Sequence, residues 1–84
     1  MSEKARIRWL CRRGMKELDV LLERFIGAEY DKLDAREHAE FLALVEKEDP
    51  DLYYLIMERT APENDIQADL LARIRLFTRP AAAG

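Results

Sequence analysis

The chain has 84 residues, of which 49% are hydrophobic and 37% charged, and its net charge is −3. This length allows one domain with a modest core and leaves little room for a deep substrate pocket. Residues 1–27 carry seven Lys/Arg and four Asp/Glu, whereas residues 28–65 carry four and twelve, so the acidic middle would repel nucleic acid.

Composition also limits the fold and the compartment. Leu, Ala, Glu, Arg and Lys dominate while Gly and Pro are few, which favours an all-α fold. A single cysteine, Cys11, can form neither an intramolecular disulfide nor a thiolate metal cluster. No apolar stretch approaches the roughly 18 residues of a membrane span, and the N-terminus has no apolar signal region. We therefore expect a cytoplasmic protein that does not insert into a membrane.

The first predicted helix covers about residues 3–13, where Ile7 and Cys11 lie on a narrow apolar stripe. Trp9 lies off this stripe, and arginines cover the rest of the helix. Gly14 is predicted to end it. The second predicted helix runs from about residue 15 to residue 30 and has the clearest amphipathic pattern of the chain. Its apolar positions are Leu18, Leu21, Leu22, Phe25, Ile26 and Tyr30.

A third helix is predicted to start at a capping box, in which Asp34 would accept a backbone N–H and Glu37 would reach back. It is expected to end near residue 47. Asp49 followed by Pro50 has the pattern of a capping aspartate before a proline in the first turn. This pattern predicts a fourth helix over about residues 50–59, with Arg59 on its inner face.

The last helix is expected to begin somewhere in residues 62–66 and to end near residue 78. Together these elements predict an all-α fold, a compact bundle of five short helices. We expect a single helical domain over residues 1–79, followed by a disordered tail at 80–84.

Catalysis by a nucleophile and base is poorly supported. The only histidine, His38, falls on an apolar helix face, where a partly buried structural role is favoured. Cys11 is favoured as a small buried residue for the same reason. No pair or cluster of metal-ligand residues has the usual spacing, and Gly14 is too isolated to form a phosphate-binding loop. We expect a protein that is not an enzyme and has no metal site.

The segment around Gly14 is the most informative of the chain. Arg13 precedes this glycine and Glu17 follows three residues later. Gly14 could simply end one helix, with Glu17 favourable in the first turn of the next. The same residues could instead form a docking point for another protein. Trp9 and the surrounding arginines favour docking, because Trp and Arg are enriched among binding hot spots.

These residues resemble a known family. The run from Lys4 to Asp19, KARIRWLCRRGMKELD, is similar to the N-terminal signature of small succinate dehydrogenase assembly factors. These are the bacterial SdhE-type proteins, which are related to the mitochondrial assembly factor 2. Further similarity lies in Glu29-Tyr-Asp31 and in Asp49-Pro-Asp-Leu52, so the resemblance extends over about residues 4–78.

The resemblance implies a five-helix fold and a function. Members of this family promote covalent attachment of FAD to a histidine of the flavoprotein subunit of succinate dehydrogenase, and in some bacteria of fumarate reductase. FAD is then the cofactor of the target, and the factor has none of its own. The expected partner is that flavoprotein subunit, bound by a monomer of this chain.

The resemblance also implies a set of partner-binding residues. They are Arg6, Arg13, Gly14, Glu17 and Asp51. Arg13 would offer its guanidinium to a carboxylate or carbonyl of the partner, and Gly14 would allow close approach of the backbone. Glu17 would pair with a basic group of the partner or stabilise a charged group near the flavin site.

Two other functions stay open from the residues alone. A helical module could bind nucleic acid through the basic N-terminal helix, although the acidic middle opposes this. An antitoxin-like or other regulatory partner of a membrane protein could use the same surface.

Overall fold

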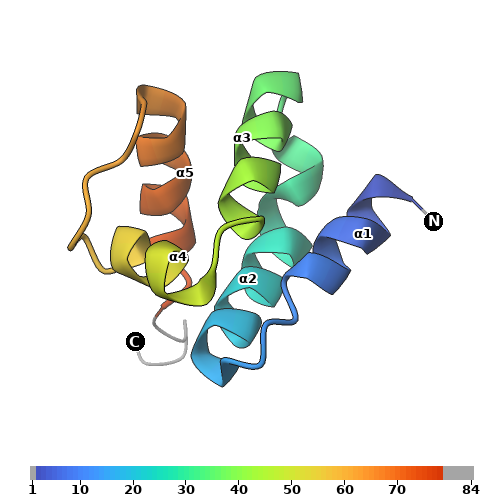
Figure 1. Cartoon of the computed structure of the whole chain (residues 1–84). Helices are drawn as coiled ribbons and strands as arrows, with labels where there is room; N and C mark the ends of the chain where they lie inside the picture. The colour runs from blue at the N-terminus through green and yellow to red at the C-terminus, as the bar shows by residue number, and fades with distance from the viewer. Residues whose placement is uncertain (1, 79–84) are drawn as a thin grey trace.

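Five α-helices and one 3-10 turn make up the part of the chain that the structure describes, residues 2–78 of a computed structural model (Figure 1). They are α1 (Glu3–Leu10), α2 (Lys16–Glu29), the 3-10 turn η1 (Tyr30–Lys32), α3 (Ala35–Val45), α4 (Asp49–Ile56) and α5 (Asp65–Arg75). The predicted all-α bundle of five short helices is confirmed. The predicted tail at 80–84 lies outside the described residues.

Local capping explains where most helices begin. The Ser2 hydroxyl accepts the Ala5 N–H at the start of α1, with 3.1 Å between Oγ and N. At α3 the predicted capping box is confirmed, since Asp34 accepts the Glu37 N–H and Glu37 accepts the Asp34 N–H, both at 2.9 Å. At α5 the Asn64 side chain accepts the Gln67 N–H at 2.7 Å.

The prediction that Asp49 caps α4 is wrong. The N-cap is Glu48, whose side chain makes no capping bond, and Asp49 is the first residue of the helix. The Asp49 carboxylate instead accepts a hydrogen bond from Arg13, which lies 36 positions earlier in the chain. A distant partner has therefore displaced the local cap that the sequence favoured.

The predicted helix ends are two to three residues too late. The helix α1 ends at Leu10 rather than at residue 13, so Gly14 lies beyond the cap and does not end the helix. The helix α4 ends at Ile56 rather than at residue 59, and Arg59 is exposed instead of buried. At the end of α1 the Leu10 carbonyl accepts from Arg13, three residues later in the chain, and at the end of α4 the Leu55 and Ile56 carbonyl groups accept from Arg75.

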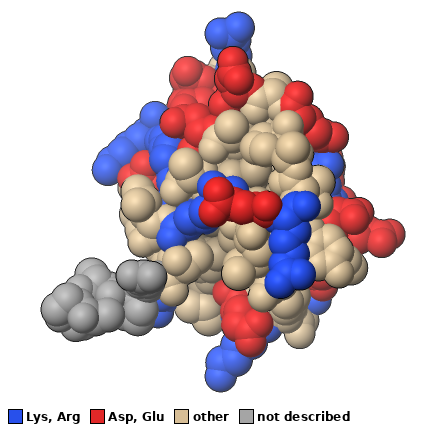
Figure 2. Space-filling model, turned by 90° about the vertical axis from the view of Figure 1, so that its left-hand side faces the viewer, with Lys and Arg blue, Asp and Glu red and all other residues tan. Residues whose placement is uncertain are grey.

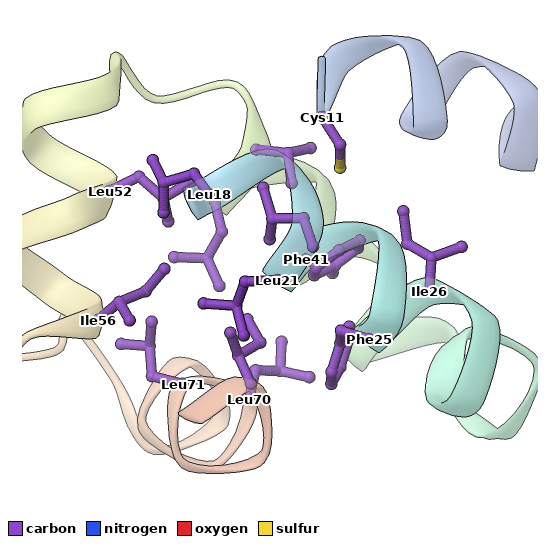
Figure 3. Packing of buried hydrophobic residues seen from close by; sticks show 14 of the residues in the cluster. Cys11, Leu18, Leu21, Phe25, Ile26, Phe41, Leu52, Ile56, Leu70 and Leu71 are labelled. Atoms are coloured by element: carbon purple, nitrogen blue, oxygen red, sulfur yellow. The ribbon is translucent and has the colours of Figure 1, made fainter. Parts of the chain in front are cut away.

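The helices α2 and α3 lie in the middle of the bundle, with α1 on one side and α4 and α5 on the other (Figure 1). The helix α3 packs against both α5 and α1. The inner face of α2 is the centre of the core, as the periodicity predicted. Phe25 packs against Phe41 of α3 and against Phe77, with ring centroids 5.2 and 6.1 Å apart. Cys11 and the α2 side chains point into this same apolar cluster (Figure 3).

Two polar clusters tie α5 to the rest of the bundle. Arg73 donates to Glu37 at 2.7 Å and to Glu29 at 3.1 Å, and this hydrogen bond holds the pKa of Glu29 below its ordinary value. The fully buried Gln67 donates to both Glu40 and Glu63 and accepts the Glu63 N–H. These long-range contacts satisfy polar groups that burial would otherwise penalise.

The end of α4 carries a residue in an unfavourable conformation. Glu58 has φ +62°, the only positive φ at a non-glycine residue among residues 2–78. The Arg59 N–H donates to the Tyr54 carbonyl at 2.8 Å and the Glu58 N–H to the Leu55 carbonyl at 3.2 Å. This pattern is a Schellman motif with Glu58 at the position where glycine is preferred.

We expect Glu58→Gly to stabilise the protein by about 0.5–1 kcal/mol, because glycine adopts positive φ without the cost that a Cβ imposes. The side chain itself contributes little, since Glu58 is exposed and its oxygen lies 4.0 Å from Arg75. Urea unfolding followed by circular dichroism measures the change. Glu58→Ala is the matched control, because it removes the same carboxylate and keeps the Cβ; it should give no gain.

Candidate docking surface

The connection between α1 and α2 forms an exposed corner around Gly14. Gly14 has φ +83°, which side chains rarely adopt, and a Cβ built there would meet no atom within 4 Å. Glycine is therefore required here by the backbone conformation and not by crowding inside the protein. The open space beside it is available to another molecule.

The side chain of Arg13 turns inward from this corner. It is only 8% exposed, and its Nε donates to Asp49 Oδ1. Its Nη1 donates to the carbonyl groups of Val45 and Leu10. Two of the three guanidinium nitrogens of Arg13, Nε and Nη1, are therefore engaged within the protein. That Arg13 also donates to a partner stays a prediction.

One guanidinium thus joins three helices. Leu10 and Val45 are the last residues of α1 and α3, and their carbonyl groups have no acceptor role inside a continuing helix. Asp49 is the first residue of α4. A cation at two helix C-termini is also favoured by the helix dipoles, so Arg13 stabilises the junction on which the Gly14 corner rests.

Glu17 lies in the first turn of α2 and is exposed. It lines a shallow hollow between α2, the end of α4 and the segment after α5, together with Leu21, Met57 and Phe77. Met57 is 49% exposed. Glu17 has no ion-pair partner among residues 2–78, so its carboxylate is free to meet a basic group.

Arg6 and Asp51 lie to the side of the corner. Arg6 is exposed on α1, and its Nη2 lies 3.9 Å from Glu46, which follows the end of α3. Asp51 is exposed on α4 and lines a separate small hollow beside Lys47. The structure therefore brings Arg6 and Arg13 against the same segment, residues 45–50, while Glu17 and Asp51 face different hollows.

Other candidate residues take the roles that their sequence context favoured. His38 is half-buried, lies 2.8 Å from the Tyr30 carbonyl through Nε2, and stacks on the Tyr30 ring. Cys11 is 2% exposed, and burial raises the pKa of its thiol to about 12, so it stays protonated at neutral pH. Trp9 is 68% exposed, as expected for a residue off the apolar stripe.

Two residues that contact Arg13 could not be recognised as its partners from the sequence. Asp19 Oδ1 accepts the backbone N–H of Arg13 at 2.8 Å, and Asp49 accepts from the side chain of the same residue. From the sequence alone, Asp19 is one of several acidic residues in the first turn of a predicted helix, and Asp49 is predicted to be a helix cap. Only the fold shows that both contact Arg13.

The described residues bring together no group of three or more His, Cys, Asp or Glu side chains suited to a metal ion. Over the same residues, no helix is long and apolar enough to cross a membrane.

Comparison with known proteins identifies the family. A family model described as "Flavinator of succinate dehydrogenase" matches residues 5–78. The FAD assembly factor SdhE of Vibrio vulnificus strain YJ016 is 46% identical over 73 residues, which cover 87% of this chain and 85% of that protein. The proteins of the same name from Vibrio cholerae and Yersinia pestis are 47% identical over 63 residues and 44% identical over 64.

These last two matches cover 75% and 76% of this chain and 73% of each relative. The family model covers the helical bundle from Ala5, in the first turn of α1, to beyond the end of α5. The chain therefore belongs to the family described as flavinators of succinate dehydrogenase, as the signature around Gly14 predicted.

Proposed function

We propose that this protein is an assembly factor that binds the flavoprotein subunit of succinate dehydrogenase and promotes covalent attachment of FAD to it. Membership of the flavinator family supports the proposal. The observation that carries it to particular residues is the Gly14 corner: Gly14 is exposed, has a positive φ, and leaves open space where a Cβ would lie. FAD is the cofactor of the target in this proposal, and the protein has none of its own.

The geometry suits a factor that acts by binding. Near the corner, the Arg13 side chain is engaged in internal bonds, whereas the Glu17 side chain is exposed. Such a surface can hold another protein in a reactive arrangement, and preorganisation of this kind lowers a barrier without supplying a reacting group. Trp9 provides an exposed aromatic anchor near the corner.

The proposal extends to the finer points that the family resemblance implied. The protein binds its target as a monomer in the cytoplasm, and the flavoprotein subunit of fumarate reductase is a second target. Gel filtration of the factor mixed with each subunit tests the stoichiometry and the choice of target.

The nucleic-acid alternative is not favoured. On the face that carries α4 and α5, acidic and basic side chains are interspersed and neither forms a continuous region (Figure 2). On α1, Arg6 and Arg8 each lie within 4 Å of a carboxylate, that of Glu46 or Glu23. A phosphate backbone would have to displace these pairs.

We expect Gly14→Asn and Glu17→Gln to fold normally and to lose most of the covalent flavinylation that the wild-type factor supports. Asparagine tolerates positive φ, so it tests the added side chain rather than the backbone. Purified flavoprotein subunit is incubated with FAD and each variant, and covalent flavin is measured by fluorescence of the denatured subunit in a gel.

Asp65→Asn is the matched control, because it removes an exposed carboxylate in the first turn of a different helix. It should support flavinylation as well as the wild type. Full flavinylation with both Gly14→Asn and Glu17→Gln would rule out this docking surface. No effect of the wild-type factor on either subunit would rule out the proposed function itself.

A further inference from the structure

We propose that Asp19 and Asp49 are positioning residues, which hold the Gly14 corner in its partner-binding shape through the two ends of Arg13. This inference rests on the proposed function, since it concerns the surface that binds the flavoprotein subunit. Neither carboxylate needs to touch the partner. Each acts on the residue that directly precedes Gly14.

Asp19 fixes the backbone of the corner. The Arg13 N–H donates to Asp19 Oδ1 at 2.8 Å. Asp19 is half-buried in the first turn of α2, so its own backbone is held by that helix. This bond crosses the loop from residue 13 to residue 19 and closes the corner on itself.

Asp49 fixes the side chain of the same residue. Its carboxylate accepts from Arg13 Nε, while Nη1 of Arg13 donates to the Val45 and Leu10 carbonyl groups. The Arg13 side chain is 8% exposed and that of Asp49 is 35% exposed, so water competes weakly for the guanidinium. The corner is thereby attached to the start of α4 as well as to α2.

Gly14 itself cannot provide this order. Glycine has the widest choice of backbone conformations of any residue, and a Cβ built at Gly14 would meet no atom within 4 Å, so packing at that point does not restrict it. The bonds to Arg13 on one side and the start of α2 on the other restrict that choice. If only a fraction of the molecules has the corner in its binding conformation, the apparent Kd equals the intrinsic Kd divided by that fraction.

The test compares Asp19→Ala with Asp19→Asn, and Asp49→Ala with Glu48→Ala. Asparagine keeps an oxygen that can accept the Arg13 N–H, whereas alanine does not. Glu48 is the exposed neighbour of Asp49 and makes no side-chain capping bond. The full chain is used at a temperature where circular dichroism shows each variant to be folded.

The first measurement is the affinity for purified flavoprotein subunit by calorimetry. We expect Asp19→Ala and Asp49→Ala each to raise Kd by about tenfold. This is the value for a variant in which about a tenth of the molecules have the corner in its binding conformation. Asp19→Asn and Glu48→Ala should bind like the wild type. A high concentration of either alanine variant should restore the yield of covalent flavin. It compensates for the weaker binding, and the residues that contact the partner are unchanged.

The second measurement does not depend on the partner. Amide hydrogen exchange by NMR should show faster exchange at the Arg13 N–H in Asp19→Ala, and loss of the protected Arg13 Nε–H signal in Asp49→Ala. A wild-type protein that binds no flavoprotein subunit would overturn the proposed function, and the exchange result would then stand as a property of the corner alone.

The inference on positioning is overturned if the folded alanine variants bind like the wild type. It is equally overturned if Asp19→Asn binds as weakly as Asp19→Ala, because the hydrogen-bond acceptor would then not be what matters. If Asp49→Ala does not fold, the comparison at Asp19 decides.

Discussion

Phe25→Ala should destabilise the protein by about 3–5 kcal/mol, the largest effect expected of any single core substitution. The Phe25 side chain is fully buried at the centre of α2 and packs on Phe41 and Phe77. A domain of this size has a total stability of roughly 4–13 kcal/mol. The substitution therefore removes a large share of it, since the small core cannot collapse to fill the space.

Thermal unfolding followed at the helix band measures this effect. The midpoint should fall by about 4–8 °C for each kcal/mol lost. Tyr54→Ala is the aromatic control, because Tyr54 is 46% exposed and removal of its ring leaves no internal cavity. A shift for Phe25→Ala no larger than that for Tyr54→Ala would contradict the central place of Phe25 in the core.

The existence and the inner faces of the helices could be predicted because their signals are local. Apolar residues in α2 recur at the helical period over four turns, and every apolar position predicted there is buried. The capping box of α3 depends on Asp34 and Glu37 alone. Signals contained within a few residues are little altered by the rest of the fold.

The helix ends could not be predicted from periodicity, because side chains outside each helix bind its last carbonyl groups. Arg13 binds the last carbonyl groups of α1 and α3, and Arg75 binds the Ile56 carbonyl at 2.6 Å and the Leu55 carbonyl at 3.0 Å at the end of α4. These arginines satisfy groups that otherwise need a local cap. Periodicity alone predicts that each of these helices ends two to three residues later than it does in the structure.

The site was predicted in part for the same reason. A glycine with positive φ at the corner was anticipated from the break between two helical patterns, and its exposed position agrees with a role in docking. The inward direction of Arg13 was not anticipated, because its partner Asp49 lies 36 residues away. From the sequence, an arginine next to a glycine is expected at the surface. Only the fold shows that a carboxylate and two carbonyl groups accept its hydrogen bonds.

Arg13→Met should destabilise the protein by about 2–4 kcal/mol. Methionine fills similar space, but it leaves the Asp49 carboxylate and two helix-end carbonyl groups without their donor. Chemical unfolding of Arg13→Met, Asp49→Asn and the double variant gives the coupling between the two side chains. We expect a coupling of at least about 1 kcal/mol, because the Arg13 side chain is almost fully buried.

The pair of Arg8 and Glu23 provides the comparison within the same molecule. Its Nη2 and Oε1 atoms are 3.5 Å apart, and the side chains are 45% and 58% exposed. Exposed pairs of this kind contribute about 0.2–1 kcal/mol and weaken further in high salt. The coupling between Arg13 and Asp49 should therefore exceed that between Arg8 and Glu23 and should persist in 1 M salt, where the Debye length is about 3 Å. Equal couplings would mean that water reaches the guanidinium as freely as it reaches Arg8, and that Arg13 is available to a partner after all.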